Sequence, residues 1–202
     1  MSTPDLTASP IDFIFNLGHS LSDEEFLRYC ALNPDFRLEL TAHGELIIRS
    51  PTSTDSGAQS GEISRQVANW ARVDGRGKAY DSSTGFRLPN NAIRSPDSSW
   101  VLKSRLTALP ADQRGPFARL SPDLAIELRS PSDTIRSLEQ KLEEYIENGT
   151  KLGILIIPET QTVVIYRPAQ TPERLENPEV VSCEPEMPGL KLEMRPIFFP
   201  DA

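Results

Sequence analysis

The sequence contains few cysteines and histidines. Among its 202 residues there are two of each, Cys30 and Cys183, and His19 and His43. No spacing among them resembles a zinc site, and we interpret the two distant cysteines as free thiols rather than a disulfide. The sequence also lacks an apolar run long enough to span a bilayer. Residues 1–10 are polar, unlike a secretory signal, so these absences together favour a cytoplasmic protein.

Basic residues are scarce relative to acidic ones. The chain has 21 Lys and Arg against 29 Asp and Glu, a net charge of −8. Phosphate binding depends largely on Lys and Arg, so this balance is unusual for a protein that acts on nucleic acid. A local basic rim can still coexist with an acidic body. The candidates for such a rim, although each residue of this kind is more often a solvated surface charge, are Arg87, Arg94, Lys103, Arg105, Arg129 and Arg136.

Length and composition indicate one globular domain. Apolar residues make up 38% of the chain and charged residues 25%, both typical of globular proteins. The 18 prolines occur in several clusters, which indicates ordered loops between elements rather than one disordered region. We expect a flexible lead-in over residues 1–18 and a single domain over residues 19–202.

Helical and strand patterns alternate along the chain. Ser22 and Glu25 have the spacing of a capping box, which predicts a helix that ends at Asn33. Alternation of apolar and polar residues predicts a hairpin over 36–49. Further expected elements are a polar loop at 50–57, helices at about 60–74 and 134–148, and strands at 78–81, 84–88, 92–94, 96–101, 123–129, 152–157 and 162–166. This order predicts an α/β (α+β) arrangement around one sheet.

Glu127 stands in the middle of the most apolar of these predicted strands. Alternation places Leu124 and Ile126 on one face of the strand, with Ala125, Glu127 and Arg129 on the other. A carboxylate is costly to bury there without a partner. The simpler interpretation is a glutamate that pairs with Arg129 or faces solvent.

Asp97 and Lys141 are the two other candidates for chemistry. Pro96 cannot donate a hydrogen bond to a sheet, so Asp97 starts a strand or occupies a bend; a turn-capping aspartate is the alternative. Lys141 lies beside the apolar stripe of its predicted helix, one turn before Tyr145. The alternative interpretation of Lys141 is an ordinary surface lysine beside glutamates.

Two carboxylates and a lysine together have a chemical meaning that each lacks alone. Mg²⁺ usually takes one or two protein carboxylates, with waters and phosphate oxygens completing its octahedron. A metal ion held in this way can polarise a phosphodiester and lower the pKa of an attacking water. A nearby lysine can orient that water or stabilise the charge that develops on phosphorus.

The motifs around these residues resemble one known family. They occur in the family's order from about residue 33 to residue 195. The chain resembles the PD-(D/E)XK nuclease superfamily, and within it is similar to the restriction-type endonucleases labelled Uma-two. The matching stretches are Gly44-Glu45-Leu46 with Ser50-Pro51-Thr52, residues 81–86, Ser95-Pro96-Asp97-Ser98-Ser99-Trp100, residues 122–127 and 129–133, Lys141 with Glu144-Tyr145 and Asn148-Gly149, and Tyr166-Arg167-Pro168.

The resemblance implies a restriction-endonuclease-like mixed central sheet flanked by helices, Mg²⁺ or Mn²⁺ as cofactor, and hydrolysis of DNA phosphodiester bonds. Asp97 and Glu127 match the metal-binding acids of the family. The lysine of the superfamily usually follows the second acid by two residues, where this chain has Arg129. In the Uma-two family it is thought to have moved to the following helix, which is the position of Lys141.

The resemblance also suggests supporting residues and leaves the activity open. Glu62 matches an acidic position that often supports the metal, and Glu45 is a second candidate that could equally be a structural hairpin residue. Arg129 and Tyr145 are further supporting candidates. The alternatives to a DNA endonuclease are a non-catalytic module that binds nucleic acid or protein, and a metal-dependent hydrolase of another phosphate substrate. We expect a homodimer, since cutting two strands favours paired sites.

Overall fold

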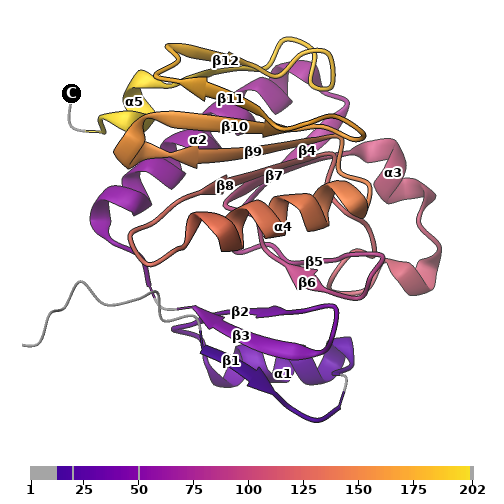
Figure 1. Cartoon of the computed structure of the whole chain (residues 1–202). Coiled ribbons are helices and arrows are strands. Elements are labelled where there is room, and N and C mark those ends of the chain that lie inside the picture. Colours follow the sequence, from indigo (N-terminus) through magenta and orange to yellow (C-terminus); the bar gives the residue numbers. More distant parts are fainter. Residues whose placement is uncertain (1–12, 20, 50, 201–202) are drawn as a thin grey trace, which may run out of the picture.

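The computed structural model describes residues 13–19, 21–49 and 51–200. Its strands divide among three sheets rather than the single sheet expected, and helices flank the largest of them (Figure 1). The strand orders are β1-β3-β2-β6-β5, β11-β10-β9-β8-β7-β4 and β12-β13. The mixed α/β class is therefore confirmed, with the predicted hairpin in the five-stranded sheet and not in the largest one.

The first sheet and helix α1 form a small N-terminal lobe. Ser22 and Glu25 make the predicted capping box, in which each side chain accepts from the other residue's backbone N–H. The hairpin of β2 and β3 is confirmed, with Leu40 opposite Leu46. The elements of this lobe and its sheet are β1 (Phe13–Asn16), α1 (Asp23–Leu32), β2 (Arg37–Leu40), β3 (Glu45–Arg49), β5 (Phe86–Arg87) and β6 (Ile93–Arg94).

The lead-in predicted for residues 1–18 lies only partly within the described residues. Phe13–Asn16 forms β1, which pairs antiparallel with β3, so that Ile14 stands opposite Ile47. Residues 1–12 lie outside the described part of the chain. The strand shows that these four residues belong to the N-terminal sheet.

Helix α2 (Thr54–Asp74) begins six residues before its predicted start, so the expected polar loop is wrong from residue 54 onward. Ser53 caps the helix by accepting a hydrogen bond from the backbone N–H of Ser56. The helix ends at Gly75, whose φ of 69° is the left-handed conformation that glycine adopts easily. Because its first turns contain serines and glycines, the sequence pattern did not reveal the capped start of this helix.

The six-stranded sheet carries the main core. Its only parallel pair among the described strands is β8 with β9, and helix α4 (Ile135–Glu147) makes the crossover that a parallel pair requires. The six strands are β4 (Gly77–Asp81), β7 (Ser98–Leu102), β8 (Leu124–Leu128), β9 (Leu152–Ile157), β10 (Thr162–Tyr166) and β11 (Glu173–Glu176). Short helices α3 (Lys103–Ala108), η1 (Ala111–Gln113) and η2 (Pro158–Thr160) join them.

Helices cover both faces of this sheet (Figure 1). On one face Leu124 and Ile126 pack with Ile63 of α2 and with the C-terminal elements β12 (Val180–Ser182), β13 (Lys191–Glu193) and α5 (Arg195–Phe198). On the other face Ala125 packs with Leu142 of α4. The predicted alternation of β8 is therefore confirmed, and Glu127 shares the face of Ala125, under α4.

Two expectations from composition can be compared with the described residues. Cys30 and Cys183 are free thiols, as predicted. Within the described ranges, every helix is too short or too polar to cross a membrane.

Candidate active site

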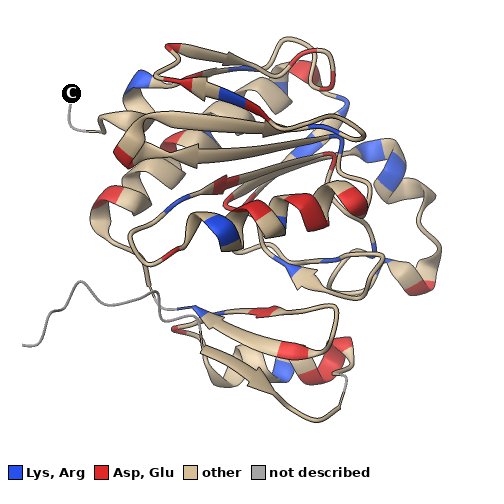
Figure 2. Ribbon diagram, viewed as in Figure 1, with Lys and Arg blue, Asp and Glu red and all other residues tan. Residues whose placement is uncertain are grey.

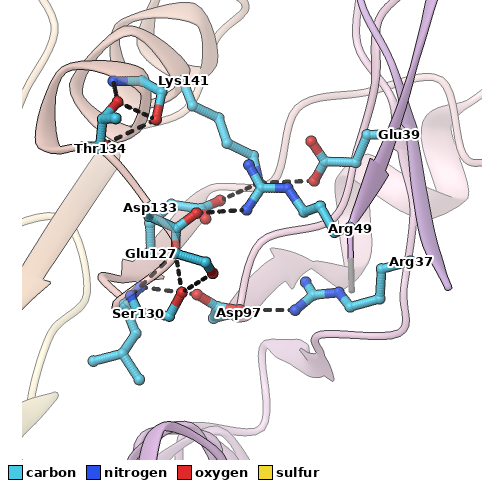
Figure 3. Close-up of polar contacts among 12 residues, drawn as sticks. Arg37, Glu39, Arg49, Asp97, Glu127, Ser130, Asp133, Thr134 and Lys141 are labelled. Atoms are coloured by element: carbon cyan, nitrogen blue, oxygen red, sulfur yellow. Dashed lines mark hydrogen bonds and ion pairs between the residues drawn. The ribbon is translucent and has the colours of Figure 1, made fainter. Parts of the chain in front are cut away.

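Asp97 and Glu127 come from adjacent strands of the central sheet. Ser98 stands opposite Ile126 in the antiparallel pair of β7 and β8. Continuing this register by one residue brings Asp97 level with Glu127. Asp97 Oδ2 accepts a hydrogen bond of 2.9 Å from the backbone N–H of Leu128, which fixes its carboxylate beside the end of β8 (Figure 3). The sheet thus brings together the two acids that the sequence singles out.

Lys141 reaches the same place from helix α4. Its ammonium Nζ lies 2.9 Å from Glu127 Oε1, and its side chain is almost completely buried. Glu127 therefore pairs with Lys141 and not with Arg129, which instead forms an ion pair with Glu159. The simpler interpretations of Glu127 and Lys141 as ordinary surface charges are both wrong, since only 1% and 5% of these residues is exposed.

A residue that the sequence did not single out completes the ion pairs of Lys141. Glu39, from β2 of the N-terminal lobe, accepts from Lys141 Nζ at 2.7 Å through Oε1. The same oxygen accepts from the backbone N–H of Ser95 at 3.0 Å. Glu39 Oε2 pairs with Arg94 at 3.3 Å. The buried lysine consequently lies between carboxylates of two different sheets.

The surroundings shift the protonation of the two glutamates in opposite directions. Burial raises the pKa of Glu127 to about 7; Lys141 opposes this shift, and the charges of Asp97 and Glu39 add to it. Burial would also raise the pKa of Glu39, but the charges of Lys141, Arg49 and Arg94 outweigh it and hold that pKa well below its ordinary range. These surroundings therefore favour the ionised form of Glu39 and disfavour the ionised form of Glu127.

Tyr145 lies one turn after Lys141 on α4, fully buried beside the same carboxylates. The ammonium of Lys141 is 5.9 Å from the centre of the tyrosine ring. Burial, followed by the charges of Glu127 and Glu39, raises the pKa of Tyr145 well above its ordinary value. The phenol therefore remains neutral and lies beside Lys141 in the buried part of the site.

A cleft of about 510 Å³ gives access to Asp97. Arg37 lines it and donates to Asp97 Oδ1 at 3.2 Å, and to the carbonyl of Ser95 at 3.2 Å. Arg49 and Asp133 also line it and form an ion pair of 3.2 Å. One wall is a face of α2 with small side chains, made of Ser56, Gly57, Ser60, Gly61 and Ser64. Asp97 is the member of the trio at the cleft surface, and Glu127 and Lys141 lie deeper.

The structure does not bring the other predicted acids to this cluster. Glu62 on α2 is held by Arg65 at 2.6 Å and by Gln66 at 2.9 Å. Glu45 lies at the start of β3 and accepts from the hydroxyl of Thr41 at 3.3 Å, as a hairpin residue would. Both carboxylates have partners close to them in sequence, so the trio is supported instead by Glu39, Arg37 and Arg49.

Most of the cations proposed for a basic rim already pair with carboxylates. Arg94 is held by Glu39 and Glu144, and Arg105 by Asp123. Arg87 pairs with Asp23, Arg129 with Glu159, and Lys103 donates to the carbonyl of Gly75. Figure 2 shows acidic and basic residues interspersed over the ribbon, with several acidic residues along α4. The cations that do line the cleft are Arg37 and Arg49.

The residues that sequence reasoning missed are non-local. Glu39 is 102 residues from Lys141, and Arg37 is 60 residues from Asp97. The available signal was the alternation of β2, where Arg37 and Glu39 share one face of a strand with apolar neighbours. A buried face carrying alternate charged residues predicts that they meet partners, without indicating which.

The central sheet thus carries two carboxylates beside a cleft, and helix α4 brings a lysine to them. The model of the Uma2 family, described as putative restriction endonucleases, matches residues 23–195, and the chain belongs to this family. Family membership supports a nuclease function and, with it, a divalent metal and a nucleic-acid substrate.

Among solved structures, the chain is similar to a putative nuclease belonging to DUF820 from Anabaena variabilis ATCC 29413. The identity is 22% and the TM-score 0.72, over 88% of this chain and 97% of that one. At this identity the similarity shows the fold. No curated protein matches the chain.

Proposed function

We propose that this protein is a divalent-cation-dependent endonuclease that hydrolyses phosphodiester bonds of DNA. Asp97 and Glu127 would hold Mg²⁺ or Mn²⁺, and Lys141 would assist the attacking water. The observation that supports this most is the 2.9 Å pair between Lys141 Nζ and Glu127 Oε1, with Asp97 level with Glu127 on the adjacent strand. Each group is costly to bury alone, and together they make a charged site at the inner end of a cleft.

The donor set fits Mg²⁺ or Mn²⁺. Such hard cations prefer carboxylate oxygens and need only one or two from the protein, with water and phosphate completing the shell. No cluster of three or more His, Cys, Asp or Glu suited to a metal occurs in the described part of the chain. Asp97 and Glu127 would be the protein's contribution, and two carboxylates suit an ion shared with a phosphate.

The residues at the proposed site would have different roles in the reaction, according to their positions. A bound cation would polarise the phosphodiester and lower the pKa of a water molecule. Lys141, a buried point charge, would orient that water and stabilise negative charge developing at phosphorus. Arg37, which lines the cleft beside Asp97, would bind a neighbouring phosphate oxygen. Tyr145 and the apolar face of α4 would keep bulk water from the lysine.

Cleavage of supercoiled and linear DNA tests this proposal. We expect cleavage with Mg²⁺ or Mn²⁺, none with EDTA, and none by Asp97→Asn or Glu127→Gln when circular dichroism shows that each variant is folded. Glu176→Gln, on the exposed edge strand β11, is the matched control and should cleave like the intact protein. Full cleavage by either site variant would overturn the assignment of the metal ligands.

A non-catalytic binding module is the alternative. The net charge of −8 and the carboxylate partners of the candidate rim cations favour it. If the intact protein cleaves no form of DNA and calorimetry detects no Mn²⁺ binding, this alternative replaces the endonuclease.

The proposed cleavage of both strands also favours a two-fold dimer, because such a dimer presents two equivalent sites. Light scattering in solution measures the molecular mass directly. A mass of about twice 22.5 kDa is expected, and a strictly monomeric protein would limit each encounter to one strand.

A further inference from the structure

Glu39 is the most completely buried anion that the proposed reaction does not use. It is 1% exposed and belongs to β2 in the N-terminal sheet, yet its carboxylate lies in the site formed by the central sheet and α4 (Figure 3). Its Oε1 accepts from Lys141 and from the backbone of Ser95, and its Oε2 pairs with Arg94. Burial of a charge requires such partners, and here they join two sheets.

Lys141 Nζ has three polar neighbours: it donates hydrogen bonds to Glu39 and to the carbonyl of Ser95, and it forms an ion pair with Glu127. Glu39 Oε1 is at 2.7 Å, Glu127 Oε1 at 2.9 Å and the carbonyl of Ser95 at 3.4 Å. An ammonium carries three donors, and two of them are used in hydrogen bonds with Glu39 and Ser95. The shortest of the three contacts is the one with Glu39. The N-terminal lobe therefore contributes the closest anion to the proposed catalytic lysine.

The position of Lys141 on a helix makes such an anchor necessary. A lysine on β8 would be placed by the strand itself. A lysine on α4 must instead extend its flexible stem across to the sheet, and fixing that stem costs side-chain entropy. Glu127 alone is a weak anchor, because its carboxylate is also a proposed cation ligand. An anion that binds nothing else at the reacting centre would keep the lysine in place.

We propose that Glu39 is a positioning residue for the nuclease reaction: it holds the Lys141 ammonium from the N-terminal sheet while Glu127 engages the cation. This inference rests on the proposed function. Ser95, held by the same carboxylate, leads through Pro96 directly to Asp97. Glu39 thus fixes the lysine and the start of the segment that carries the first acid.

A double-mutant cycle tests whether Glu39 acts through Lys141. Glu39→Gln removes the charge at nearly constant shape, and we expect kcat for DNA cleavage to fall about 100-fold, as for a misplaced catalytic group. KM should change by less than about twofold, because substrate contacts remain. In a Lys141→Met background, adding Glu39→Gln should change kcat by less than about twofold. Equal losses in both backgrounds would overturn the proposal.

Glu144→Gln is the matched control. Glu144 on α4 is the other carboxylate of Arg94, at 2.6 Å, but it is not a partner of Lys141. If Glu39 acted only by holding Arg94, the two glutamine variants would lose similar activity. We expect Glu144→Gln to retain kcat within about threefold of the intact protein. Urea unfolding establishes that each variant is folded. If Glu39→Gln fails to fold, Glu39→Asp replaces it in the cycle, because the shorter side chain keeps the charge but moves it away from Lys141.

A second measurement does not depend on cleavage. Ammonium protons of a buried, hydrogen-bonded lysine exchange slowly enough to give a ¹⁵N-correlated NMR signal, which Lys141→Met would assign. Glu39→Gln should abolish that signal, and Glu144→Gln should retain it. If the intact protein cleaves no DNA, loss of the signal in Glu39→Gln still supports the anchor while the proposed function fails. An unchanged signal overturns the anchor in either case.

Discussion

The metal-free protein should lose stability as the pH rises from 4.5 to 7, because of the single carboxyl group of Glu127. Burial raises the pKa of this group from its ordinary 4.5 to about 7, and the charges of Asp97 and Glu39 add to the shift although Lys141 opposes it. The folded state therefore favours the protonated form. Glu127→Gln replaces that form with a neutral side chain of nearly the same shape.

The magnitude follows from the difference between the two pKa values. At about 1.4 kcal/mol for each pH unit, a change from 4.5 to about 7 corresponds to roughly 3 kcal/mol. Because the folded pKa is raised, this stability is fully present below pH 4.5 and is lost as the pH rises through about 7. Glu127 is only 1% exposed, so solvent screening reduces the effect little.

Urea unfolding in EDTA at about pH 5 and about pH 8 measures this effect. The free energy of unfolding of the intact protein should fall by roughly 3 kcal/mol more than that of Glu127→Gln between the two conditions. Glu176→Gln, which also removes one carboxyl group but from the surface, should behave like the intact protein. Mg²⁺ at about 100 times its Kd should restore about 2.7 kcal/mol at the higher pH, and only when Glu127 is present.

Identical pH dependence in the intact protein and Glu127→Gln would refute this reasoning. It would mean that Lys141 and its neighbours compensate fully for burial, so that Glu127 is ionised in the metal-free protein at every pH measured. The site would then be a prearranged ion pair, and a cation would have to compete with Lys141 for a carboxylate that is already charged.

Two further predictions concern the framework that positions the site. Gly77→Ala should destabilise the protein by about 1–3 kcal/mol in urea unfolding, because the added Cβ would lie 2.1 Å from the Trp100 ring. Gly61→Ala is the control, since a Cβ at that position would meet no atom within 4 Å. Equal stability of the two variants would contradict the packing argument. Ser22→Ala should cost about 1 kcal/mol through loss of the capping box of α1, measured in the same way, and no change would show that this cap does not contribute.

Local patterns in the sequence predicted most elements. The capping box at Ser22 and the alternation of β8 depend on residues a few positions apart, and both appear as expected. The start of α2 was missed because its first turns contain serines and glycines, whose low helix propensity is overridden by the Ser53 cap and by burial of Ile63. The division of strands among three sheets depends on pairings such as Leu40 with Ile93, which no local pattern specifies.

The candidate site could also be predicted only in part from local sequence patterns, for a physical reason. The sequence predicted Asp97 and Glu127 because a strand pattern and a family resemblance agreed on them. The sequence pattern did not single out Glu39 and Arg37, because their importance lies in contacts with residues 55 to 102 positions away in the sequence. A buried charge indicates only that a partner exists. Which residue that partner is depends on how the two sheets meet.

The exchange of Arg129 for the usual lysine can be explained by these contacts. Arg129 follows Glu127 by two residues, just after the end of β8, but it pairs with Glu159, and a side chain from α4 occupies the space beside Glu127. Lys141 occupies that space, where Glu39 supplies a second carboxylate at 2.7 Å. The proposed catalytic lysine on α4 and the buried glutamate on a separate sheet would therefore act as one structural unit, in which each side chain holds the other in place.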